Sequence, residues 1–228
     1  MKKEFFKNFN NRLSLNKISK SIIKNKIILD VNCDQSNYSW IFKKLGAREI
    51  YCFYQKKKPL YYDKKTTLIK KNFVNFNFKN KKFDFIFYNG GLSHSILWKY
   101  ELEKLGDICN KGGFLWLSLF GESKFWNYTK GIQKKLNNRD VENFEKVLQF
   151  RDWNKNKIKF LKDLFFSKKI FFTKKKIVSY LRKNNFGQIK FLSRGAKTDL
   201  VEVIRKKPSL KSILANGEIR LIAKKLSE

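Results

Sequence analysis

The 228-residue chain is 42% hydrophobic and 16% aromatic, which suffices for one sizeable core and excludes an intrinsically disordered chain. Lys and Arg outnumber Asp and Glu by 52 to 19, a net charge of +33, so the composition predicts contact with a polyanion, either RNA or an anionic membrane surface. No apolar run approaches the roughly 18 residues of a transmembrane segment, and three scattered cysteines argue against a disulfide framework or a metal site and favour the cytoplasm.

The first half of the chain alternates between predicted helices and strands. Leucine and isoleucine recur at helical spacing in Asn11–Lys24, which predicts a short amphipathic helix. The apolar run Lys26–Val31 contains an acid near its end and is typical of a strand buried on both faces of a parallel sheet. The elements that follow are a helix at Tyr38–Leu45, strands at Glu49–Tyr54, Thr66–Ile69 and Phe83–Tyr88, a helix at Leu97–Cys109 and a strand at Phe114–Leu119. This alternation predicts an α/β fold, with a Rossmann-like, open, mostly parallel sheet and helices on both faces.

The pattern changes after Gly121. Charged amphipathic helices are expected at Val141–Phe150, Ile158–Phe166 and Lys174–Lys183. We interpret residues 122–183 as a helical insertion or cap after the fifth strand, within a single domain of residues 1–228. We expect it above the carboxyl edge of the sheet, where α/β folds bind their ligands. Strands resume at Gln188–Leu192 and Ile219–Ala223, and these are predicted to pair as an antiparallel C-terminal edge.

The turn after the first strand is the strongest candidate for a ligand site. The strand ends in Asp30, a polar turn follows, and a helix begins at Tyr38. In parallel sheets this arrangement places a ligand at the carboxyl edge, near the free N–H groups of the helix start. Residues 30–36 read Asp-Val-Asn-Cys-Asp-Gln-Ser. This segment resembles the first motif of the class I S-adenosylmethionine-dependent methyltransferases, a strand followed by D-x-G-x-G-x-G.

Two later segments resemble the same family, in the same order and spacing. Phe83–His94 resembles its fourth strand and following loop, and Leu105–Leu117, with the turn Lys111-Gly112-Gly113, resembles its connection into the fifth strand. The resemblance implies S-adenosyl-L-methionine as cofactor and methyl transfer to a small molecule or RNA. It assigns no catalytic residue, because methyl transfer needs little beyond in-line placement of the reactants. The cofactor-binding residues that it implies are Asp30, Asn32, Cys33, Asp34, Ser36, Tyr54, Asn72 and Asn89.

The chain departs from the family pattern where the cofactor would bind. Asn32, Asp34 and Ser36 replace the three glycines of the first motif, and their Cβ atoms obstruct the close approach of the backbone to a ligand. Tyr54 and Asn72 stand at positions where the family usually has acids. These losses leave open a second hypothesis, in which the chain is a non-catalytic, methyltransferase-like basic module that binds RNA or an anionic surface.

The charge itself has two explanations. Most of the basic residues are lysines, and Asn, Ile, Phe and Tyr are also abundant, so a codon bias accounts for part of the excess. If instead the charge forms a working polyanion site, the lysines of residues 56–58, 64–65 and 174–176 are expected to gather on one face.

Overall fold

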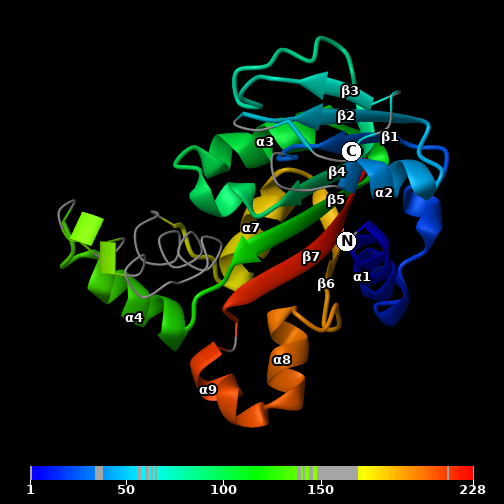
Figure 1. Ribbon diagram of the computed structural model, residues 1–228. Helices are drawn as coiled ribbons and strands as arrows, with labels where there is room; N and C mark the ends of the chain where they lie inside the picture. Colours follow the sequence, from blue (N-terminus) through cyan, green and yellow to red (C-terminus); the bar gives the residue numbers. More distant parts are fainter. Residues whose placement is uncertain are drawn as a thin grey trace.

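A seven-stranded sheet forms the centre of the molecule (Figure 1). The computed structural model describes residues 2–33, 38–55, 58–59, 62, 64, 66–137, 140, 142–143, 146–147, 169–214 and 216–227. In order across the sheet the strands are β3 (Thr66–Ile69), β2 (Glu49–Phe53), β1 (Ile27–Asp30), β4 (Phe83–Asn89), β5 (Cys109–Phe120), β7 (Glu218–Lys225) and β6 (Phe186–Phe191). The first five are parallel neighbours, and β7 is antiparallel to both β5 and β6. The predicted fold class is therefore confirmed, including the antiparallel C-terminal strands.

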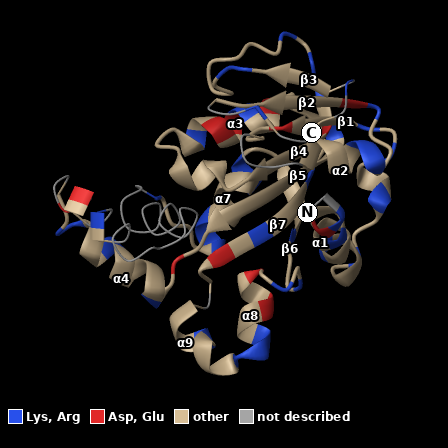
Figure 2. Ribbon diagram, in the orientation of Figure 1, with Lys and Arg blue, Asp and Glu red and all other residues tan. Residues whose placement is uncertain are grey.

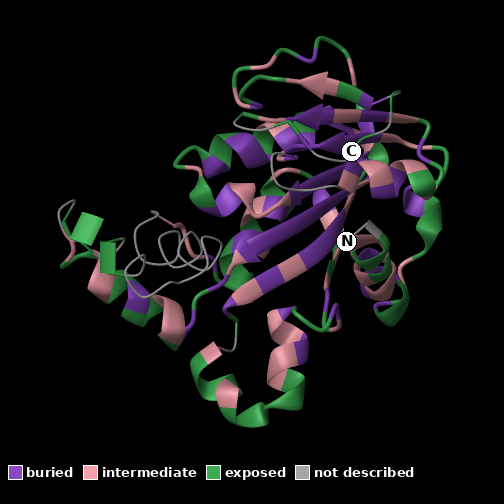
Figure 3. Ribbon diagram, viewed as in Figure 1, coloured by how far each residue is buried: buried purple, intermediate pink, exposed green. Residues whose placement is uncertain are grey.

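The molecule has two hydrophobic cores, one on each face of the sheet, because successive side chains of a strand point to opposite sides. Phe85 and Phe87 face the core beneath α1 (Lys2–Leu15) and α2 (Tyr38–Lys44). Ile86 and Tyr88 face the other core, which α3 (Trp98–Ile108) and α7 (Lys174–Lys183) cover. Figure 3 shows the central strands buried along most of their length between these layers.

The N-terminal helix begins earlier than its predicted bounds. Its inward face is built from Phe9 and Leu13, which are almost fully buried, and it ends at Leu15 rather than near residue 24. Lys17 has a φ of 52°, a left-handed conformation that a helix cannot continue through. The Asn16 amide donates to the carbonyls of Arg12 and Arg194 at 2.7 and 2.8 Å and fixes the end of the helix. Only the short 3₁₀ helix η1 (Lys20–Ile22) follows.

The segment after β5 contains two described helices in different places. Helix α4 (Lys124–Gln133) extends away from the end of β5 (Figure 1). Helix α7 instead buries Ile177 and Leu181 against the sheet in the layer that contains α3, so it does not cover the carboxyl edge as we expected for residues 122–183. The helices predicted at 141–150 and 158–166 lie largely or wholly outside the described residues. None of the described helices combines the length and apolar character needed to cross a bilayer.

A cluster of buried ion pairs joins the two ends of the described chain. Arg12 of α1 donates to both carboxylate oxygens of Asp199, from Nε at 2.7 Å and Nη2 at 2.6 Å. Arg220 of β7 forms a second ion pair with Asp199 and a third with Glu218 at 2.5 Å. Asp199 immediately precedes α8 (Leu200–Lys206), which is followed by η3 (Pro208–Leu210) and α9 (Lys211–Leu214). The pairs therefore hold α1, β7 and the start of α8 together.

Stability should fall when the pH is lowered through the range in which Asp199 gains a proton. Burial alone would raise the pKa of Asp199, but the Arg12 hydrogen bonds and the Arg220 charge outweigh it and lower the pKa to about 2, from 3.8. A depressed carboxyl pKa stabilises the folded state above the unfolded pKa and loses that effect as the pH falls from about 4 to 2. The shift corresponds to about 2 kcal/mol. Urea unfolding at pH 7, 4, 3 and 2 measures this loss, and Asp199→Asn should remove its contribution to the slope; an unchanged slope contradicts the assignment.

Candidate functional site

The carboxyl ends of the five parallel strands meet at one edge of the sheet, and backbone hydrogen bonds extend the strand pairing into the loops that follow. The Cys33 N–H donates to the Phe53 carbonyl at 2.9 Å, and the Tyr54 N–H donates to the Ile69 carbonyl at 3.1 Å. Across the sheet, the Gly90 N–H donates to the Ser118 carbonyl at 3.0 Å. These hydrogen bonds hold the first residues after β1, β2 and β4 at the same edge of the sheet.

Asp30 ends β1 within the core rather than on the surface. It is fully buried, opposite Cys52 in the register of β1 and β2. The pKa of the Cys52 thiol is raised well above its usual value by its hydrogen bond with Cys33, by burial and by the Asp30 charge. The Cys52 thiol therefore stays protonated at neutral pH, and Cys33 beside it is equally buried. Asp30 presents no exposed surface, so its direct contact with a ligand stays a prediction.

The other predicted cofactor residues divide by exposure. Asn32, Tyr54 and Asn89 are half-buried at the edge, where their polar groups are within reach of solvent. Asn72 is exposed, and its side-chain oxygen accepts a hydrogen bond from the Val74 N–H at 3.0 Å, so it turns the chain after β3. Asp34 and Ser36 lie outside the described residues. The structure thus brings Asp30, Asn32, Cys33 and Tyr54 to adjacent strand ends, with Asn89 one strand further along.

The loop after β4 is held by a buried carboxylate that sequence reasoning missed. Glu101 of α3 accepts from the Tyr88 hydroxyl at 2.7 Å and from the Ser95 hydroxyl at 2.6 Å. Burial and the Glu101 charge raise the pKa of Tyr88 well above its usual value, so the hydroxyl remains a donor. The Tyr88 ring lies 2.2 Å from where a Cβ of Gly91 would be, which explains the second glycine of the run Asn89-Gly90-Gly91 at the end of β4. The Asn-Gly-Gly run was the one sequence signal of this packing.

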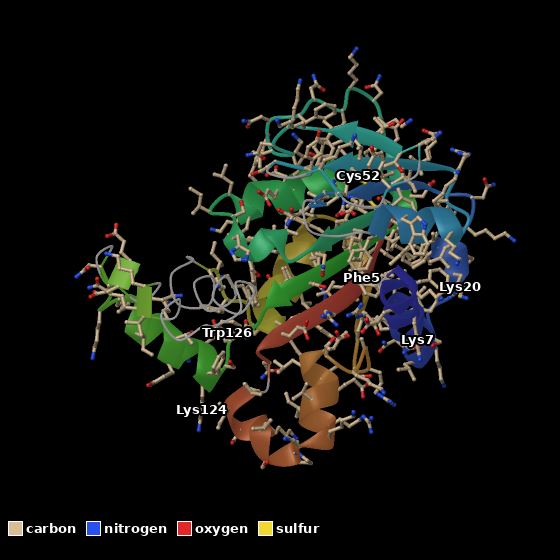
Figure 4. The ribbon with its side chains drawn as sticks, viewed as in Figure 1. Phe5, Lys7, Lys20, Cys52, Lys124 and Trp126 are labelled. Atoms are coloured by element: carbon tan, nitrogen blue, oxygen red, sulfur yellow. The ribbon has the colours of Figure 1, made fainter. Side chains whose placement is uncertain are left out.

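Aromatic side chains gather where β5 ends. The Trp126 ring of α4 lies 5.0 Å from the Phe120 ring and 5.5 Å from the Phe171 ring, and His94 meets the Phe120 ring at 5.5 Å. Figure 4 labels Trp126 at this end of the sheet. The Trp126 indole N–H donates to the Gly217 carbonyl at 2.9 Å, which fixes the ring. All four side chains keep part of their surface exposed, so they form an aromatic patch beside the carboxyl edge.

Of the lysines that were expected to cluster, those that the structure describes lie on opposite sides of the sheet. Lys58 and Lys64 lie between β2 and β3, at one edge, whereas residues 174–176 begin α7, which packs against β6 at the other edge. Figure 2 shows basic residues distributed over most described elements. Among the described residues, the expected single cluster is therefore not formed.

Comparison with solved structures gives close agreement in fold and little in sequence. A protein of Listeria monocytogenes described as a putative S-adenosylmethionine-dependent methyltransferase superimposes with a TM-score of 0.61 and 12% identity, covering 96% of this chain and 100% of that one. The 1,6-didemethyltoxoflavin-N1-methyltransferase of Burkholderia thailandensis gives 0.56 and 11%, covering 95% and 77%. Magnesium protoporphyrin IX methyltransferase of Synechocystis PCC 6803 gives 0.54 and 12%, covering 89% and 75%.

The sequence itself matches no protein-family model and no curated protein. At these identities the likeness is one of fold. It agrees with the strand order, with the antiparallel β7 between β5 and β6, and with the helical layers on both faces. The resemblance inferred from residues 30–36, 83–94 and 105–117 is thereby confirmed at the level of structure: the chain has the Rossmann-like fold of the class I S-adenosylmethionine-dependent methyltransferases.

Proposed function

We propose that this chain is a methyltransferase that binds S-adenosyl-L-methionine over the carboxyl ends of β1, β2 and β4. One observation carries the proposal. Asn32, Cys33, Tyr54 and Asn89 lie at the carboxyl edge of the sheet, beside the point where the strand order reverses. Ligands of open α/β sheets bind outside the carboxyl ends of the strands, where the strand order reverses. Here the order reverses between β1 and β4. Solved structures of two proteins with this fold contain S-adenosylhomocysteine, which supports the same choice of cofactor.

The residues at this edge fit the cofactor through neutral groups. Tyr54 and Asn89 offer a hydroxyl and an amide at the positions expected for contacts with the ribose and the reacting end, and Asn32 offers an amide beside β1. The cofactor supplies an activated methyl group, so the protein has only to bind and orient the reactants. Neutral hydrogen bonds are about half as strong as charge-assisted ones, and the carboxylate of Asp30 is buried. We therefore expect weaker binding than an acidic ribose contact would give.

The aromatic patch of His94, Phe120, Trp126 and Phe171 favours a flat small-molecule acceptor. The rings of Phe120, Trp126 and Phe171 are half-buried and pack on one another, so they present apolar area to a planar ligand at little entropic cost. Two of the similar structures belong to methyltransferases named for small molecules, 1,6-didemethyltoxoflavin and magnesium protoporphyrin IX. An RNA base, which also stacks on aromatic rings, is the other acceptor to be tested.

Replacing Tyr54 by Phe should weaken S-adenosylmethionine binding by about 2- to 10-fold, the equivalent of one neutral hydrogen bond. Isothermal titration calorimetry of the purified chain measures the affinity directly. Tyr180→Phe is the matched control, because Tyr180 is also half-buried but packs against Trp98 in the α3–α7 layer; its affinity should not change. Absence of any heat at millimolar cofactor would overturn the proposal.

The net charge of +33 favours one rival function, that of a non-catalytic basic module for RNA or an anionic surface. The absence of cofactor binding, together with polyanion binding that weakens steeply with salt, would support this rival. Cofactor binding that Tyr54→Phe weakens would exclude it as the sole function of the fold.

A further inference from the structure

A basic recess lies at the amino edge of the sheet, opposite the proposed cofactor site. Its volume is about 550 Å³, and four lysines (Lys17, Lys26, Lys111 and Lys190) line it together with Ser19 and Ser21. Lys26 precedes β1, Lys111 lies near the start of β5 where its register with β4 shifts, and Lys190 lies on the edge strand β6. Three segments distant in sequence (residues 17–26, 111 and 190) thus bring ammonium and hydroxyl groups to one place. The proposed methyl transfer uses none of them.

The positive charge of the recess is largely uncompensated. Asp84 is the one acid among the residues that line it, and both of its carboxylate oxygens are already engaged. They accept hydrogen bonds from the Ile27 N–H at 2.9 Å and from the Asn110 amide at 2.7 Å. Lys190 is held in place by its bond to the Asn16 carbonyl at 2.5 Å. The lining therefore carries four lysines and one carboxylate, and the oxygens of that carboxylate are bonded to Ile27 and Asn110 rather than to the lysines.

The backbone around the recess is unusual. Lys17 and Gln188 have φ values of 52° and 45°, and Gly112 has 74°, so three residues of the lining adopt the left-handed region. For a residue with a side chain this conformation is uncommon and costs free energy, and such residues concentrate at functional sites. Gln188 also lies within the register shift of β6 between Gly187 and Lys190. The irregular part of β6 and the Lys111-Gly112-Gly113 segment of β5 both line the recess.

We propose that this recess binds a small polyphosphate or a multiply phosphorylated metabolite. Ammonium groups make strong, charge-assisted hydrogen bonds to phosphate oxygens, and several around one recess suit a ligand with several charges. Its volume falls in the range of about 300–1,000 Å³ that is typical of small-molecule sites. A single recess favours a compact ligand over RNA, because an RNA strand needs a track of cations along its backbone.

Calorimetry with inorganic tripolyphosphate at about 0.15 M salt tests the proposal on the full chain. The double variant Lys26→Ala/Lys111→Ala should bind at least about tenfold more weakly, because two charge-assisted hydrogen bonds are lost. The matched control is Lys175→Ala/Arg182→Ala, which removes two charges from a second basic hollow that α7 alone forms and should change the affinity less than about twofold. Equal weakening by both pairs would show binding to the general surface charge and overturn the proposal, as would no effect of the first pair.

A charge-neutral variant separates the recess from long-range electrostatics. Ser21→Tyr keeps the net charge and fills part of the recess, so tripolyphosphate binding should weaken while the urea unfolding curve remains that of the parent chain. Unchanged binding in this variant would contradict the proposal. A single-stranded RNA oligonucleotide is titrated in parallel: if the lysine pair weakens RNA binding but not tripolyphosphate binding, the ligand class is wrong.

Discussion

Replacing Asp199 by Ala should lower the free energy of unfolding by about 3–5 kcal/mol, the usual cost of removing one partner from a buried ion pair. The carboxylate is 2% exposed and pairs with two arginines, Arg12 and Arg220. Without it, both guanidinium groups remain desolvated near one another, and only Arg220 keeps an acidic partner, Glu218. Urea unfolding at pH 7 measures the change.

The control for this variant is Glu103→Ala. Glu103 is exposed on α3, and a surface substitution of this kind changes stability by about 0.5 kcal/mol or less. A loss below about 1 kcal/mol for Asp199→Ala would mean that the pairs behave as surface ion pairs and do not fasten α1 to α8 and β7.

Replacing Phe87 by Ala should cost about 3–5 kcal/mol, as is typical of removing a buried aromatic side chain. The Phe87 ring is 1% exposed and lies 4.5 Å from the Tyr38 ring, 5.3 Å from Phe42 and 5.9 Å from Trp116. It therefore joins β4 and β5 to α2. Denaturant unfolding monitored by tryptophan fluorescence reports the loss.

The comparison for Phe87→Ala is Phe125→Ala on α4, which removes the same atoms from a half-buried site. Because less apolar area returns to water there, its cost should be clearly smaller. An equal loss of unfolding free energy in the two variants would show that the contacts of Phe87 with the sheet and α2 stabilise the protein no more than a half-buried ring does.

The strands of the parallel sheet could be predicted because their sequences are nearly continuous apolar runs. The run ending at Asp30 and the run 83–88 leave little choice of structure, since both faces of each strand must be covered. The helix predicted at 174–183 has the same bounds as α7. It could be predicted because Ile177 and Leu181, four residues apart, form an apolar side among charged residues. Tyr54 and Asn89 were assigned from the family resemblance, and the fold brings them to one edge because parallel strands place their carboxyl ends together.

The elements that were missed depend on contacts between distant residues. The first half of α1 is held by Phe9, whose burial against Phe42 and Trp116 is not visible in a sequence rich in lysine and asparagine. Likewise, α8 is fixed by Glu218, which accepts from the Leu200 N–H at 3.0 Å across 18 residues. Glu101 was passed over as one more charged helix residue, because only the fold brings it under Tyr88 and Ser95.

The pairing of Arg12 with Asp199 has a consequence for the growing chain. The two residues are 187 positions apart, and at a synthesis rate of about 5–20 residues per second Arg12 waits about 10–40 seconds for its partner to be made. Strand β7, which joins β5 to β6, is translated later still. During that interval one border of β5 lacks its native neighbour, and an unpaired strand edge of this kind exposes a nascent chain to chaperones and to aggregation.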